Sequence, residues 1–95
     1  MTSLNGKVAF ITGASSGIGY AAALELARRG CHVAASAQTV AALDGLAQAV
    51  AELPEPHGEL LALAADVRHA AGLQEAVLAT TTRFGRLDVL VANAG

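Results

Sequence analysis

The feature that most constrains the fold is a regular alternation of two kinds of segment. Short runs of Val, Ile, Leu and Ala are separated by longer stretches in which apolar residues recur every three or four positions. Continuous apolar runs are typical of strands that are buried on both faces, and the longer spacing is typical of helices that lie on a sheet. The alternation therefore predicts an α/β domain, with a parallel sheet covered by helices on both sides.

Seven elements follow from this alternation. Strands are expected at residues 7–12, 32–36, 60–65 and 87–92, and helices at residues 17–29, 39–53 and about 70–82. Gly30 ends the first helix, Thr39 caps the second, and the loop at 54–58 contains prolines that a helix interior does not tolerate. Right-handed crossovers then predict an open, doubly wound sheet. The apolar stripes expected to face the sheet are Ile18, Ala22 and Leu26 in the first helix, Val40, Leu43, Leu46, Val50 and Leu53 in the second, and Leu73, Val77, Thr81 and Phe84 in the third.

A glycine-rich segment, residues 12–19, joins the first expected strand to the first expected helix. Glycines at such a junction let a phosphate approach the backbone N–H groups at the positive end of a helix. Gly13 is expected to make a tight turn, Gly17 to leave space for a diphosphate, and Gly19 to let the helix approach the sheet. Ser15 and Ser16 can add hydroxyl donors. The segment predicts a diphosphate-binding loop, but not a nucleoside-triphosphate P-loop, because no Gly-Lys-Ser/Thr follows.

Two other interpretations of the segment stay open at this point. Turns in general are rich in glycine, so a turn without a ligand is one of them. The other is a serine hydrolase, since residues 13–17 match Gly-x-Ser-x-Gly and Asp66 and His69 follow in a suitable order. Those two residues are close neighbours on one loop, however, whereas a triad needs the acid behind the far nitrogen of the histidine. Labelling of Ser15 by a fluorophosphonate would support the hydrolase.

The glycine spacing, Gly-x-x-x-Gly-x-Gly preceded by Thr12, resembles that of the short-chain dehydrogenase/reductase family. Two further segments agree with it. Asp66-Val67 follows the third expected strand, and Phe-Gly-Arg-Leu-Asp at 84–88 leads into Val-Ala-Asn-Ala-Gly at 91–95, with Ala at position 92 where the family more commonly has Asn. The resemblance covers essentially the whole chain. It implies a Rossmann-type sheet of order 3-2-1-4, truncated after the fourth strand, with residues 1–95 forming an incomplete dinucleotide-binding domain.

The same resemblance implies an NAD(P)-dependent oxidoreductase that transfers hydride between a nicotinamide cofactor and an alcohol or carbonyl substrate. Asp66 also has a structural alternative as the cap of its loop, and Asn93 has one as a tie between the fourth strand and the Thr12 hydroxyl. The resemblance places Gly13, Ser15, Ser16, Gly17, Ile18 and Gly19 at the diphosphate and the adenosine ribose, Asp66 and Val67 beside the adenine, and Asn93, Ala94 and Gly95 along the cofactor crevice.

The choice between NAD and NADP depends on the end of the second expected strand. An acid there would bind the ribose 2′-hydroxyl and repel a 2′-phosphate, and a basic residue would favour the phosphate. Ala37 stands where NAD-preferring relatives usually have Asp, and Gln38 stands where NADP-preferring relatives often have Arg. Ser16 also lacks the basic side chain that many of the latter carry in the glycine loop. The balance favours NADP slightly, with Gln38 included among the cofactor-binding residues.

The family's proton-transfer residues have no counterpart in the chain. They are a tyrosine, a lysine four residues later and a serine, whereas Tyr20 lies in the first expected helix and the one lysine is Lys7. We expect a fragment that does not turn over substrate alone, and the alternative is a non-catalytic module that binds nucleotide or a partner chain. The outer edge of the fourth strand is expected to lack a partner strand, which predicts self-association.

Charge and composition exclude several other classes. A net charge of −2 and a single lysine give no basic surface for nucleic acid. No apolar run approaches the ~20 residues of a membrane span, and the first run is too short for a signal peptide, so a cytoplasmic protein is expected. Cys31 is the one cysteine and is expected to pack as a small apolar residue. The histidines at positions 32, 57 and 69 are too scattered to predict a metal site.

Overall fold

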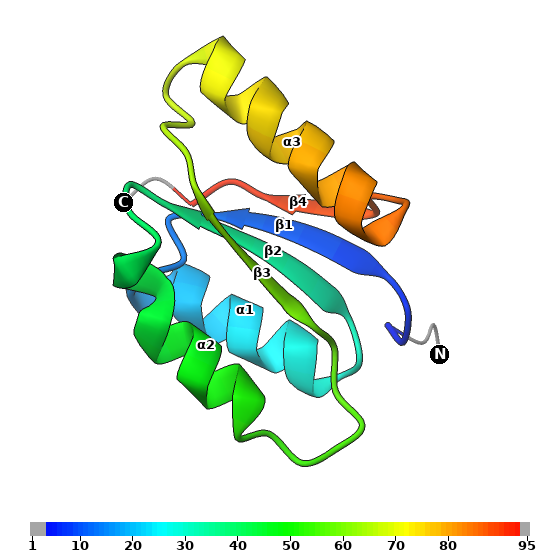
Figure 1. The fold of residues 1–95 in the computed structure, drawn as a ribbon. Helices are drawn as coiled ribbons and strands as arrows, with labels where there is room; N and C mark the ends of the chain where they lie inside the picture. The colour runs from blue at the N-terminus through cyan, green and yellow to red at the C-terminus, as the bar shows by residue number, and fades with distance from the viewer. Residues whose placement is uncertain (1–3, 94–95) are drawn as a thin grey trace.

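The computed structural model describes residues 4–93 of the chain. A four-stranded parallel sheet lies between helices, and its strand order β3-β2-β1-β4 confirms the predicted order (Figure 1). The carboxyl ends of the strands meet at one edge of the sheet, which is where open α/β sheets bind their ligands. The elements are β1 (Val8–Thr12), α1 (Gly17–Arg28), β2 (His32–Ala37), the 3₁₀ turn η1 (Ala41–Leu43), α2 (Asp44–Ala51), β3 (Leu60–Ala64), α3 (Ala70–Phe84) and β4 (Val89–Val91).

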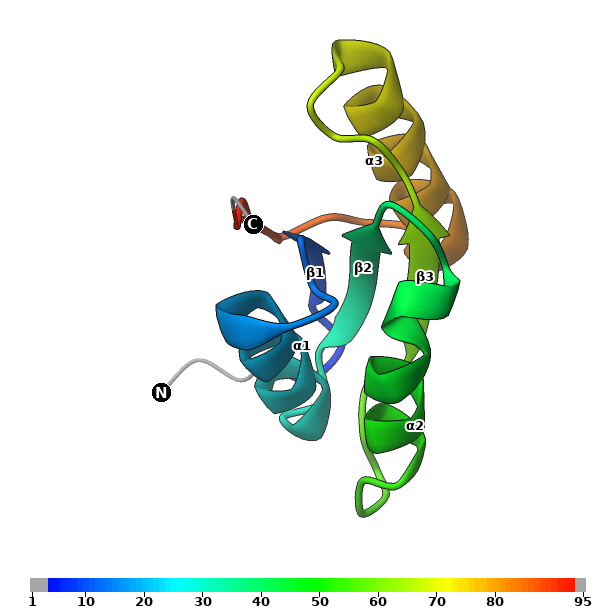
Figure 2. The ribbon, with the colours of Figure 1, turned by 90° about the vertical axis from the view of Figure 1, so that its left-hand side faces the viewer.

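The helices cover both faces of the sheet, as the alternation predicts. Helices α1 and α2 lie on one face and α3 lies on the other (Figure 2). Side chains alternate along the strands, so that Ile11 and Val33 pack in the cluster beneath α1 and α2, while Phe10 and Ala34 pack in the cluster beneath α3. Residues 8–12 of β1 are buried throughout, because β1 has a strand on each side and helices on both faces.

The predicted stripe of α1 is wrong by one position. The helix buries Gly19, Ala23 and Ala27, whereas the side chain of Ile18 is 78% exposed. Small residues on this face let the helix axis come close to the sheet, so the buried stripe is the one with the smallest side chains. Counting large apolar residues therefore selects the neighbouring stripe. Ile18 instead lies at the rim of the glycine-rich loop.

The stripe of α3 also needs correction, whereas the stripe of the second helix is confirmed at Leu43, Leu46 and Val50 and is wrong only at Val40. Helix α3 buries Ala76 and Thr80, whereas the predicted Leu73 and Val77 are only partly buried. Thr80 lies in the core because its hydroxyl donates a 2.8 Å hydrogen bond to the Ala76 carbonyl one turn earlier. Val40 is 48% exposed, because the chain enters α2 through η1 rather than through a regular helix.

Side-chain hydrogen bonds occur at the ends of two helical segments. The Thr39 hydroxyl accepts a 3.3 Å hydrogen bond from the Ala42 amide of η1, whereas α2 itself starts later, at Asp44, without a side-chain cap, so Thr39 does not cap α2 as predicted. Arg28 and Arg29 bond to Glu25 at the negative end of α1, where a cationic side chain is favoured. The described helices include no segment long and apolar enough to cross a bilayer.

Candidate functional site

One continuous trough runs along the carboxyl ends of the strands. It consists of two adjoining hollows of about 460 and about 590 Å³, which share Gly13, Ala37, Gln38 and Asn93. The Asp66 hollow is lined in addition by Ser36, Ala65, Asp66, Val67 and Arg68, and the glycine-loop hollow by Ser15, Ser16, Gly17, Ile18, Thr39 and Ala42. Except for Gly19, which packs behind the loop, the site residues predicted within 4–93 all line the trough. Ala94 and Gly95 lie outside the described residues.

The glycine-rich loop leaves its backbone donors available to a ligand. Gly13 and Gly17 both have φ +63°, a conformation that favours glycine, and a Cβ built on Gly17 would meet no atom within 4 Å. The Ala14 amide anchors the loop by a 3.2 Å hydrogen bond to the Ser36 carbonyl. The following four amides, at residues 15–18, donate no hydrogen bond within the part of the chain that the structure describes. Open backbone and unengaged donors at the start of α1 fit a diphosphate.

Asn93 joins the end of β4 to the loop. Its backbone amide donates to the Thr12 hydroxyl at 2.9 Å, and its side-chain amide donates to the Gly13 carbonyl at 3.1 Å. Gly19 packs against the same point, because a Cβ at this position would lie 2.5 Å from the Gly13 carbonyl oxygen and 2.8 Å from Asn93 Nδ2. The expected tie between Asn93 and Thr12 is thus confirmed, and it fixes one wall of the trough.

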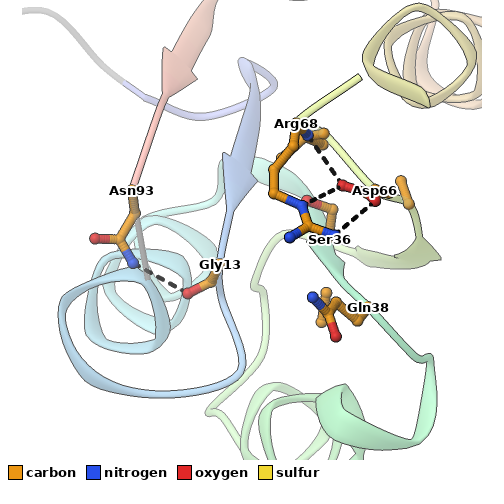
Figure 3. A pocket seen from close by; sticks show the side chains of 9 residues that line it. Gly13, Ser36, Gln38, Asp66, Arg68 and Asn93 are labelled. Atoms are coloured by element: carbon orange, nitrogen blue, oxygen red, sulfur yellow. Dashed lines mark hydrogen bonds and ion pairs between the residues drawn. The ribbon is translucent and has the colours of Figure 1, made fainter. Parts of the chain in front are cut away.

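The carboxylate of Asp66 is engaged by Arg68 in the Asp66 hollow (Figure 3). One carboxylate oxygen accepts from the backbone amide of Arg68 at 3.1 Å and from its Nε at 2.9 Å, and the other accepts from its Nη2 at 2.9 Å. These bonds to Arg68 lower the pKa of the Asp66 carboxyl from 3.8 to about 2. Asp66 therefore caps its own loop, which was its structural alternative. Its predicted contact with adenine stays a prediction.

The structure adds three residues that the sequence did not single out. Ser36 is 1% exposed, lines the trough, and its hydroxyl has no hydrogen-bond partner among the described residues. Arg68 brings a cation to the site. Gly72 lies in the first turn of α3, where a side chain would overlap the Asp66 carbonyl. A glycine inside a predicted helix indicates close approach of another backbone segment, so Gly72 could have been identified from the sequence. The roles of Ser36 and Arg68 depend on contacts between separate segments.

The residues of the hydrolase interpretation do not form a triad. His69 Nε2 lies 3.6 Å from Asp66 Oδ2, but neither bonds to Ser15, which lines the other hollow. Residues 4–93 also contain no cluster of three or more potential metal ligands.

A parallel sheet of this order, with a glycine loop at the first strand-to-helix junction, defines a Rossmann-type fold. A sequence model of the short chain dehydrogenases matches residues 7–95, and the chain belongs to this family. The chain is 44% identical, over its whole length, to a 3-oxoacyl-[acyl-carrier-protein] reductase of Synechocystis. It is 42% identical, over 97% of its length, to D-threitol dehydrogenase of Mycolicibacterium smegmatis.

Solved structures show the same fold. A short-chain type dehydrogenase/reductase from Mycobacterium marinum superimposes with a TM-score of 0.90 at 36% identity, covering 98% of the chain and 36% of that protein. Glucose dehydrogenase of Caenorhabditis elegans superimposes with a TM-score of 0.86 at 38% identity, covering 99% of the chain and 40% of that protein. The chain likewise spans 38% of the Synechocystis reductase and 34% of the threitol dehydrogenase.

Proposed function

We propose that the chain binds NAD(P) along the trough and is the cofactor-binding portion of an oxidoreductase. The observation that carries this proposal is the glycine loop, whose amides at 15–18 make no hydrogen bond to described residues and line an open hollow. When bound, the nicotinamide would supply the hydride exchanged with an alcohol or carbonyl substrate. The named relatives are reductases and dehydrogenases, which supports this reaction class.

Each part of the trough has its own role in the proposal. The loop amides, with the hydroxyls of Ser15 and Ser16, would hold the diphosphate, and the absent side chain of Gly17 leaves room for it. Gln38 would face the adenosine ribose, and the Asp66 hollow would receive the adenine. The buried Ser36 hydroxyl at the floor of that hollow supports a polar ligand, because an unpaired buried hydroxyl is costly. Asn93 would hold the crevice wall beside the loop.

The chain by itself would bind cofactor without transferring protons. Tyr20 lies in α1 and Lys7 precedes β1, at the opposite end of that strand from the trough. We therefore expect no change in nicotinamide absorbance when the chain is mixed with cofactor and a panel of alcohols and carbonyl compounds. Clear turnover would contradict this part of the proposal.

Calorimetric titration tests the proposed function directly. We expect the chain to bind NADPH, NADH and 5′-AMP, and to bind adenosine at least about tenfold more weakly than AMP, because adenosine lacks the phosphate that the loop amides would receive. NADP is the slightly favoured cofactor, since Ala37 and Gln38 provide no carboxylate to repel a 2′-phosphate. If none of these ligands binds, the proposed function is contradicted and a purely structural role is favoured. Equal affinity for AMP and adenosine would contradict the phosphate role of the loop.

A further inference from the structure

The charge along the trough is limited to one ion pair. Among its lining residues, Asp66 and Arg68 are the charged ones, and the glycine-loop hollow contains neither a cation nor an anion. The remaining cations of the chain lie elsewhere. Arg28 and Arg29 bond to Glu25, Arg83 to Glu59 and Arg86 to Asp88, and Lys7 precedes the first strand. An anionic group in the trough therefore meets a single positively charged side chain, that of Arg68.

The Arg68 guanidinium is held in one orientation with donors to spare. Its Nε and Nη2 donate to the two oxygens of Asp66, each at 2.9 Å. Its Nη1 makes no hydrogen bond to any residue within 4–93, and the side chain is 74% exposed. Figure 3 shows the Arg68 guanidinium and the Gln38 amide beside the same hollow, Arg68 from the loop after β3 and Gln38 from the end of β2. The unused N–H groups of the Arg68 guanidinium therefore lie beside Gln38, the residue that would face the adenosine ribose.

We propose that Arg68 is the residue that selects a dinucleotide carrying a phosphate on its adenosine 2′ oxygen. The proposal rests on the proposed function, because it takes the adenosine to lie in the Asp66 hollow. A guanidinium fork suits phosphate by both geometry and charge. The side chains nearest the expected ribose, Gln38 and Thr39, are neutral and can supply hydrogen bonds but no charge. The glycine loop and the end of β2 contribute no cation to the trough, and Arg68, in the loop after β3, contributes one.

Three small ligands isolate this contact. Adenosine 2′,5′-bisphosphate carries the additional phosphate, adenosine 3′,5′-bisphosphate carries equal charge at the neighbouring oxygen, and 5′-AMP lacks the phosphate. By calorimetry, the 95-residue chain should bind the 2′,5′ compound about tenfold more tightly than either of the others, which is the scale of one charge-assisted hydrogen bond. The advantage should decrease as salt is raised, because Arg68 is exposed.

Variants of two similar ion pairs, Arg68–Asp66 and Arg86–Asp88, test whether Arg68 is responsible for the preference. Arg68→Gln should reduce the preference for the 2′ phosphate to about twofold or less, and Arg68→Lys, which keeps the charge without the fork, should retain part of it. Arg86→Gln is the matched control, since Arg86 also bonds to an aspartate two residues away through Nε and Nη2, but at the amino end of β4. The control should leave the preference unchanged. Circular dichroism checks that all three variants are folded.

The outcomes separate this inference from the proposed function. If AMP binds but the two bisphosphates bind equally, Arg68 does not select the 2′ phosphate, although the cofactor site stands. The inference is equally contradicted if Arg68→Gln is folded and keeps the full preference, or if it weakens all three ligands equally. If the unaltered chain binds none of the three, the proposed function fails and the inference fails with it.

Discussion

The Thr12 hydroxyl lies 2.9 Å from the Asn93 amide, across 81 residues of sequence, and accepts its hydrogen bond. The hydroxyl also donates to the Asn93 carbonyl at 3.4 Å, so it meets both backbone groups of one residue. Because β1 and β4 are joined by three residue pairs, this contact extends their pairing to the edge where the trough opens. The glycine loop starts one residue later, and its position depends on the contact.

Replacing Thr12 with valine should therefore destabilise the fold. The substitution preserves shape but leaves the Asn93 amide without its acceptor in a largely buried position, because Thr12 is 7% exposed. A loss of about 1–3 kcal/mol in the free energy of unfolding is expected, measured by urea denaturation. Thr82→Val on the exposed surface of α3 is the control and should change stability by less than about 0.5 kcal/mol. Equal effects of both substitutions would show that the contact contributes nothing.

Two helical glycines should respond in opposite directions to alanine. A Cβ at Gly19 would lie 2.5 Å from the Gly13 carbonyl oxygen, so the loop or the helix must move, and we expect a loss of about 1–3 kcal/mol together with weaker AMP binding. A Cβ at Gly45, in α2, meets nothing within 4 Å, so Gly45→Ala should gain about 0.5–1 kcal/mol. Thermal unfolding and calorimetry measure both effects. A stable Gly19→Ala variant with normal AMP affinity would contradict the packing described for the loop.

Local pattern was sufficient to predict the architecture and the glycine loop. The alternation of strands and helices, the tight turn at Gly13 and the close approach at Gly19 follow from apolar runs and glycine spacing, which act over short stretches of chain. The strand order was implied by the family resemblance. The resemblance also predicted the tie between Asn93 and Thr12. The stripe of α1 was missed because the sheet selects the small side chains of Ala23 and Ala27, a preference that a count of large apolar residues does not contain.

The electrostatics of the site needed the three-dimensional structure. Asp66 was predicted as a site residue, but its bonding to Arg68 depends on the turn that the backbone makes after β3. Arg68 shares a hollow with Gln38 only because β2 and β3 are neighbours in the sheet. The sequence predicts only that Ser36 lies in a strand. That its hydroxyl has no partner among the described residues is evident only in the folded structure.

The Asp66 carboxyl should titrate at unusually low pH. Hydrogen bonds from Arg68 lower its pKa to about 2, and Arg68→Gln should raise the midpoint toward 3.8. A carboxyl whose pKa is lower in the folded chain stabilises the fold above its unfolded pKa, and this contribution is lost as the pH falls toward the folded value. For Asp66 the loss should thus occur between about 3.8 and about 2. Carbon NMR of the side chain measures the midpoint, which Arg86→Gln should not move; a wild-type midpoint near 3.8 would contradict the ion pair.

The edge formed by β4 should make the chain associate with itself. In the described sheet, β4 pairs with β1 on one side only, and Leu90 on this strand is 55% exposed. An apolar edge with unpaired backbone groups is a template for a further strand. We therefore expect dimers or larger species in sedimentation velocity at about 100 μM, a concentration in the range where exposed strand edges associate.

Substitution of Leu90 by lysine distinguishes association through strand pairing at β4 from non-specific association of exposed apolar side chains. A charged side chain on an edge strand opposes pairing, so Leu90→Lys should move the distribution toward monomer. Leu78→Lys is the matched control, because Leu78 is 65% exposed but lies on α3 and not on β4. If β4 is the contact, the Leu78 variant should associate as the unaltered chain does. If the Leu78→Lys chain is monomeric while the Leu90→Lys chain still associates, the contact lies on α3. If the unaltered chain is monomeric, pairing through the β4 edge is contradicted.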